Sequence, residues 1–140
     1  MISVIMASYL GDYPHSASNR TEKFIRAVDS FLHQTFNESE LIIVSDGCHK
    51  TIELYNKNYY SQESIRLIKI DKQPMFGGYT RNVGIEYSIG DWICYLDTDD
   101  IFGYNHLEII GAQLDPDYDW FYYNDYLNKR GHTKIRDVRS

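Results

Sequence analysis

Residues 92–100 read WICYLDTDD, an apolar run that ends in three carboxylates within four positions. Such a run predicts a buried strand, and its unbroken apolar character favours a central place in a sheet. Asp97, Asp99 and Asp100 repel one another and resist losing water, so their crowding calls for a compensating partner. A divalent cation is the natural candidate, because hard cations prefer oxygen ligands. The alternative is a solvated acidic loop that merely follows a strand.

The rest of the chain alternates between strand-like and helix-like patterns. Short runs rich in β-branched residues predict strands, and segments with helical spacing of apolar residues lie between them. Asn19, with Glu22 three residues on, has the form of a capping box and predicts a helix start. The expected strands cover residues 2–7, 40–45, 65–70, 91–96 and 119–123; the expected helices begin at residue 19, lie around residues 52–59, and cover residues 80–88 and 105–114. This alternation predicts an α/β domain with a mostly parallel sheet flanked by helices.

Polar and acidic residues follow three of the predicted strands. Ser8 and Tyr9 end the first strand, Asp46 ends the second, and the cluster from Asp97 to Asp100 ends the fourth. Ligands of such sheets bind beyond the carboxyl ends of the strands. We therefore expect these residues to lie along one edge of the sheet and to form a site. Taken singly, Asp46-Gly47 is an ordinary turn signal and Arg81 an ordinary solvated helix residue.

Composition and charge narrow the class of protein. The chain has 140 residues, of which 43% are hydrophobic and 24% charged, as expected of one compact domain with its own core. A formal net charge of −6 without a Lys/Arg cluster argues against nucleic-acid binding. Cys48 and Cys94 lack the spacing of a disulfide framework or a zinc site. No apolar run is long enough to span a membrane, so we expect a cytoplasmic protein, which leaves peripheral work at a membrane surface open.

Two other motifs share the acidic pattern and fit poorly. An EF-hand loop starting at Asp97 would place Ile101 at a ligand position and Phe102 where the loop needs glycine. A phosphatase of the haloacid dehalogenase type carries its paired aspartates on an early strand, with partner motifs downstream. Only forty residues follow Asp100 here, which disfavours that class.

Five short motifs occur in an order typical of a known family. They are SVIMASY (3–9), SFLHQTF (30–36), ELIIVSDG (40–47), GGYTRNVGI (77–85) and WICYLDTDD (92–100). Together they resemble the nucleotide-sugar-binding half of family 2 glycosyltransferases, which have the GT-A fold. The resemblance runs from Ile2 to about Asp125. It implies a nucleotide-sugar-binding domain over residues 1–128, with residues 129–140 as a polar tail or the start of a missing acceptor-binding region.

The resemblance also implies roles for individual residues. Ser8 and Tyr9 match the position that flanks the base of the nucleotide, and Asp46 matches the acid that pairs with uracil. Arg81 matches a basic residue near the base and diphosphate. Asp97 and Asp99 match the DxD motif, which holds the ribose and a metal ion, Mn²⁺ or Mg²⁺. Related enzymes shift the metal duty by one position, so Asp100 competes with Asp99 for it.

The implied activity is a metal-dependent and inverting transfer of a sugar from a UDP-sugar. The acceptor would be a glycan or a lipid-linked glycan in polysaccharide or cell-surface glycan synthesis. Inverting enzymes of this fold use a carboxylate base from the acceptor-binding half, most of which we expect this chain to lack, so we assign no base. The alternative is a truncated module that binds nucleotide-sugar without turning it over. Leu10, where the family often has Asn, and a longer loop over residues 11–19 are departures from the family pattern.

Overall fold

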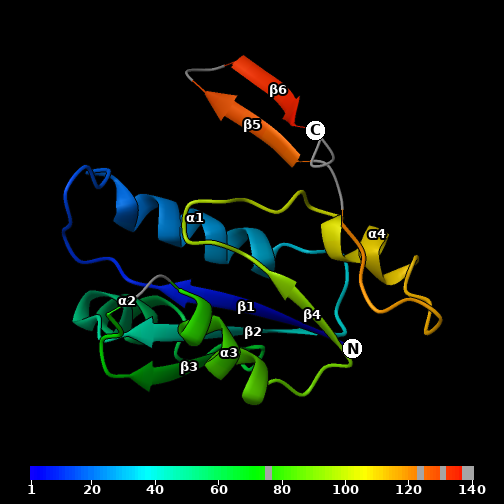
Figure 1. The fold of residues 1–140 in the computed structure, drawn as a ribbon, viewed down its shortest axis with the longest axis horizontal. Helices are drawn as coiled ribbons and strands as arrows, with labels where there is room; N and C mark the ends of the chain where they lie inside the picture. The colour runs from blue at the N-terminus through cyan, green and yellow to red at the C-terminus, as the bar shows by residue number, and fades with distance from the viewer. Residues whose placement is uncertain (75–76, 123–124, 130–131, 137–140) are drawn as a thin grey trace.

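The computed structural model describes residues 1–74, 77–122, 125–129 and 132–136. Its centre is a four-stranded sheet in the order β3-β2-β1-β4, and every neighbouring pair in it is parallel. The strands are β1 (Ile2–Ser8), β2 (Ser39–Asp46), β3 (Ile65–Ile70) and β4 (Trp92–Tyr95). Arrowheads of β1, β2 and β3 point to the same side in Figure 1, so their carboxyl ends share one edge. The expected α/β class with a mostly parallel sheet is confirmed.

The helices cover both faces of this sheet. They are α1 (Arg20–Leu32), α2 (His49–Asn58), α3 (Gly78–Glu86) and α4 (His106–Gly111). Figure 1 shows α1 on one side of the sheet and α3 on the other. Between two parallel strands the chain has to return to the edge of the sheet where the first strand began. A tight turn cannot do this, so the connection runs through a helix.

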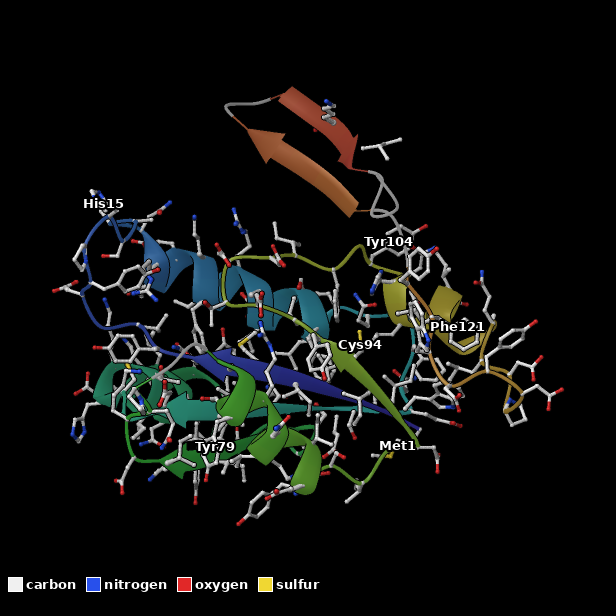
Figure 2. All side chains as sticks on the ribbon, viewed as in Figure 1. Met1, His15, Tyr79, Cys94, Tyr104 and Phe121 are labelled. Atoms are coloured by element: carbon white, nitrogen blue, oxygen red, sulfur yellow. The ribbon has the colours of Figure 1, made fainter. Side chains whose placement is uncertain are left out.

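Two hydrophobic clusters, one on each face, account for the apolar runs of the central strands. Val4 and Met6 of β1 belong to the cluster that includes α1, whereas Ile5 between them packs with Val83 of α3. Successive side chains of a strand point to opposite faces, so a strand covered on both sides is apolar at every position. Cys94 of β4 packs against the first cluster, while Tyr79 of α3 lies on the opposite side (Figure 2).

Two sequence predictions are wrong, one about the sheet and one about the start of a helix. The run at residues 92–96 was expected to form a central strand, but β4 is an edge strand of the described sheet and its residues are half-buried or exposed. The central positions belong to β1 and β2, which are buried along nearly their whole length. Asn19 is the N-cap of α1, but its side chain makes no capping hydrogen bond, so the predicted capping box does not form.

The segment after α4 also differs from expectation. Residues 119–122 form no strand, and position 123 lies outside the described residues. Phe121 instead packs its ring against Trp92 of β4, with ring centroids 5.6 Å apart. The next strands are β5 (Asp125–Lys129) and β6 (His132–Arg136), which pair with each other as an antiparallel hairpin. The hairpin is drawn apart from the main sheet in Figure 1.

Candidate functional site

The strand order changes direction between β1 and β4. The chain runs from β1 to β2 and β3 on one side and then returns to place β4 on the other side of β1. A parallel sheet whose connections diverge in this way has its ligand site beyond the carboxyl ends of the two diverging strands. The residues predicted from the strand ends lie around this point.

Asp46, at the end of β2, is a buried carboxylate with two hydrogen-bond donors. The backbone N–H of Gln73 donates to Oδ1 at 2.7 Å, and Nζ of Lys72 donates to Oδ2 at 2.8 Å. The Asp46 side chain is 8% exposed, whereas that of Lys72 is 46% exposed. The same ammonium lies 4.6 Å from the centroid of the Tyr9 ring. Asp46 and Tyr9 are therefore brought together at the edge of the sheet, with Lys72 in contact with both.

Ser8 differs from its neighbour Tyr9 in where its side chain lies. Its hydroxyl is buried and shares a 2.8 Å hydrogen bond with the Thr51 hydroxyl of α2. Ser8 has the same parity along β1 as Val4 and Met6, so its side chain faces the side of the sheet that α1 covers. Of the Ser8-Tyr9 pair, only the Tyr9 ring is positioned to contact a ligand with its side chain.

Cys48 is part of the support beneath this edge. Its sulfur accepts a hydrogen bond from the Leu10 backbone N–H at 3.2 Å, and its own N–H donates to the Ser45 hydroxyl. Burial works to raise the pKa of the Cys48 thiol, but hydrogen bonds from Thr51 and from nearby backbone N–H groups outweigh it and lower the pKa. These contacts tie the loop after β1 to the start of α2.

Arg81 and Asp97 form the second pair of predicted residues that the structure brings together. Nη2 of Arg81, on α3, lies 2.6 Å from Oδ1 of Asp97, in the loop that follows β4. The guanidinium carbon is also 5.7 Å from the centroid of the Tyr95 ring. Both side chains of the ion pair are more than one-third exposed, so the pair is open to solvent and to a ligand. A guanidinium in this position presents further N–H donors to an anion.

A small pocket lies beside this loop, on the side of α1. It has a volume of about 90 Å³ and is lined by Tyr13, Ala17, Arg20, Lys23, Thr98 and Asp99. The Arg20 guanidinium donates to the backbone oxygens of Tyr9 and Gly11 and covers the Tyr13 ring. The pocket therefore joins the loop before α1, where Figure 2 labels His15, to the acidic loop after β4.

The carboxylates of the acidic loop do not form a complete metal cage. Asp99 and Asp100 are exposed, and Asp97 is half-buried in its contact with Arg81. Within the described part of the chain, no three His, Cys, Asp or Glu side chains group as metal ligands. Mg²⁺ and similar ions bind through one or two carboxylates and complete their shell with water and substrate phosphates. The exposed carboxylates fit that mode of binding.

Sequence reasoning missed the basic residues Arg20, Lys23 and Lys72 at this site. Lys72 was detectable, because it follows β3 and the strand-end argument applies to that strand as well. Arg20 and Lys23 carry no such signal, since they begin a helix whose direction depends on the loop at residues 11–19. Among the helices of the described residues, none combines the length and apolar character needed to span a bilayer.

The chain belongs to glycosyl transferase family 2, whose family model matches residues 16–136. It is 32% identical over 87 residues to the amylovoran biosynthesis glycosyltransferase AmsB of Erwinia amylovora. The aligned region covers 60% of this chain and 29% of AmsB. It is also 28% identical over 126 residues to WfgD of Escherichia coli, named as a UDP-Glc:alpha-D-GlcNAc-diphosphoundecaprenol beta-1,3-glucosyltransferase. This alignment covers 90% of the present chain and 46% of WfgD. The chain therefore spans less than half the length of these relatives.

The fold is also shared with solved structures of S. aureus TarS. The structure of S. aureus TarS 1–349 in complex with UDP matches with a TM-score of 0.66 and 22% identity, over 79% of this chain and 31% of that one. The TarS complex with UDP-GlcNAc matches with a TM-score of 0.62 and the same identity, over 79% and 29%. This likeness confirms the GT-A fold, of which the present chain covers only part.

Proposed function

We propose that the edge formed by Tyr9, Asp46, Arg81 and Asp97 is the donor site of a glycosyltransferase that takes a UDP-sugar. The observation that carries the proposal is the placement of a buried acceptor, Asp46, beside an aromatic ring, and of a half-buried Arg81–Asp97 pair at the neighbouring strand ends. UDP in a TarS structure and UDP-Glc in the name of WfgD support this choice of donor. Residues 1–128 would form the donor-binding domain, with residues 129–140 as a polar tail or the start of an acceptor-binding region.

Asp46 and Tyr9 would recognise the base. A carboxylate that accepts from the uracil N3–H is selective, because cytosine presents no N–H at that ring position. The ring of Tyr9 would stack on the base, and the backbone at Ser8 would flank it. Arg81 would donate charge-assisted hydrogen bonds to the diphosphate, and Asp97 would accept from the ribose.

Asp99 would hold a divalent cation, Mn²⁺ or Mg²⁺, with Asp97 and Asp100 as the other candidate ligands. Phosphate oxygens of the donor would complete the ligand set, as the exposed positions of Asp99 and Asp100 allow. When bound, such a cation acts as a Lewis acid and stabilises the charge that develops on the leaving nucleoside diphosphate.

In the proposed reaction the acceptor hydroxyl attacks the anomeric carbon of the sugar. The bond from that carbon to the diphosphate breaks, UDP leaves, and a base takes the hydroxyl proton, with inversion at the anomeric carbon. We assign the base to no residue of this chain. A glycan or lipid-linked acceptor is proposed by analogy with the names of AmsB and WfgD. The reaction would then belong to polysaccharide synthesis, with the protein working in the cytoplasm or peripherally at a membrane surface.

Calorimetric titration of UDP, with Mn²⁺ and then with EDTA, tests the donor site. Asp99→Asn should remove the metal-dependent part of the affinity. Asp46→Asn should weaken binding about tenfold or more, because a hydrogen bond to a charged group contributes about 1.5–3 kcal/mol. Asp119→Asn, an exposed position beyond α4, makes the same charge change and should leave binding unaltered. Absence of UDP binding with and without Mn²⁺ would refute the proposal.

A second assay separates an enzyme from a binding module. If this chain turns the donor over, UDP-glucose with Mn²⁺ should slowly release UDP while its glucose is transferred to water or to an added acceptor. Donor binding with no release of UDP would favour the non-catalytic module for this stretch of chain.

A further inference from the structure

Lys72 occupies the space between the two residues proposed to recognise the base. Its ammonium is 2.8 Å from Oδ2 of Asp46 and 4.6 Å from the centroid of the Tyr9 ring. It also donates to the backbone oxygen of Gln73 at 2.8 Å. One flexible side chain thus engages both the acceptor and the ring surface that a uracil would use.

The backbone of this segment is built to hold Lys72 in place. Gly47 has a φ of +59°, and a Cβ at that position would lie 2.6 Å from the backbone nitrogen of Lys72. The Gly47 N–H donates to the Ile70 oxygen at 2.9 Å, and the Gln73 N–H donates to Asp46 at 2.7 Å. The loops after β2 and β3 are therefore joined at Lys72, and its side chain starts next to Asp46.

Tyr9 is held from another direction. A Cβ on Gly11 would lie 2.5 Å from the Tyr9 hydroxyl oxygen, so the backbone of Gly11 closes on that end of the ring. A base that stacks on the ring face beneath the Lys72 ammonium has to take its place.

We propose that Lys72 acts as a latch on the base subsite. In the free protein its side chain occupies the subsite, and the incoming base displaces that side chain. This inference rests on the proposed function, since it needs a base to bind beside Tyr9 and Asp46. In this way Lys72 would set the affinity for the UDP-sugar. It would also favour bases that have an N–H able to replace the ammonium in its hydrogen bond to Asp46. Cytosine, which has no N–H at the same ring position, would displace it poorly.

Uridine is the suitable probe, because it carries the base without the phosphates that an ammonium would also attract. Lys72→Met keeps the length of the side chain and removes its charge. A partly exposed ion pair and a cation–π contact together shift an equilibrium by about tenfold, so uridine should bind Lys72→Met about tenfold more tightly than wild type. Lys72→Arg keeps the ion pair and should remain within about twofold of wild type.

Lys69→Met is the matched control, because Lys69 is an exposed residue of β3 and loses the same charge. Its uridine affinity should equal that of wild type, and its UDP affinity gives the general effect of removing one positive charge. Melting temperatures of the variants, taken without ligand, establish that each one folds. The titrations are followed by calorimetry for UDP and by chemical shifts for uridine.

The outcomes separate the latch from the proposed function. If wild type binds UDP and uridine, and Lys72→Met binds uridine equally or more weakly, the latch is refuted and the donor site stands. If neither ligand binds wild type or Lys72→Met, the donor site and the latch both fail. Uridine binding that tightens in Lys72→Met and not in Lys69→Met supports both.

Discussion

Glu40→Gln should destabilise the protein by acting at the edge of the sheet opposite the site. The Glu40 side chain is 7% exposed and accepts four hydrogen bonds. The Ser3 hydroxyl and the Ile89 N–H donate to Oε1 at 2.6 and 2.9 Å. Nη2 and Nε of Arg66 donate to Oε2 at 2.6 and 2.9 Å. One carboxylate thereby joins β1, β2, β3 and the segment that leads into β4.

The size of the effect follows from what glutamine can replace. Its amide oxygen can still accept from Ser3 and Ile89, but its NH₂ group faces the Arg66 guanidinium, donor against donor. Hydrogen bonds to a charged group contribute about 1.5–3 kcal/mol each, and the 38% exposure of Arg66 reduces that value through water. We expect the free energy of unfolding to fall by about 2 kcal/mol at neutral pH.

The effect should depend on pH in a defined direction. Burial works to raise the pKa of Glu40, but hydrogen bonds from Ser3, the Ile89 N–H and Arg66, together with the charge of Arg66, outweigh it and hold the pKa below its ordinary value of 4.5. A carboxyl whose pKa is lowered on folding contributes stability above its unfolded pKa and loses that contribution as pH falls through the folded pKa. The difference between wild type and Glu40→Gln should be full at pH 7 and shrink below pH 4.5.

Urea unfolding at pH 7 and at intervals down into the acid range measures this difference. Glu38→Gln is the control, because Glu38 is exposed and lies two residues away on the chain. It should leave the free energy of unfolding within about 0.5 kcal/mol of wild type. Equal stability of Glu40→Gln and wild type at pH 7, or a difference that stays constant with pH, would refute the reasoning.

Two further substitutions test the packing of the helices. Gly84→Ala would place a Cβ 2.5 Å from Cγ2 of Ile5, so α3 should be pushed away from the sheet. The free energy of unfolding in urea should fall by about 1–2 kcal/mol, although alanine has the better helix propensity. An unchanged or higher stability would contradict this contact. Tyr59→Phe removes the hydroxyl that donates to Asp29 at 3.0 Å. Burial and the neighbouring Asp29 raise the pKa of Tyr59, so this hydroxyl stays protonated. The loss should be about 1–2 kcal/mol, while exposed Tyr60→Phe should change nothing measurable.

The fold class was predictable from the sequence because its strongest signal is local. The apolar runs of β1 and β2 and the helical spacing between them follow directly from burial on both faces of a parallel sheet. The position of β4 was not predictable, because an apolar run shows that a segment is shielded from water and does not show which strands lie beside it. Part of the shielding of β4 comes from an aromatic ring, Phe121 against Trp92, instead of a further strand.

The segment at residues 119–122 illustrates the same limit. Its aromatic residues have high strand propensity, but propensity cannot supply a partner strand. Phe121 makes ring contacts with Trp92 and Tyr118, which give the segment packing without a ladder.

The candidate site was predictable where it depended on strand ends alone. Parallel strands bring Tyr9, Asp46 and Asp97 to one edge whatever the loops do. The contact of Lys72 with Asp46 depends on the positive φ of Gly47 and the path of the loop after β3, which pattern and propensity do not define. The metal assignment to Asp99, with Asp97 and Asp100, stays a prediction. So do the nucleotide-binding roles of Ser8, Tyr9, Asp46, Arg81 and Asp97.

A crystal structure of the chain with UDP and Mn²⁺ tests the central claim most directly. The account predicts the uracil beside Tyr9 with its N3–H on Asp46, the diphosphate next to Arg81, and the cation on Asp99. UDP bound away from the carboxyl ends of β1, β2 and β4, or bound there with its base turned away from Asp46, would contradict it.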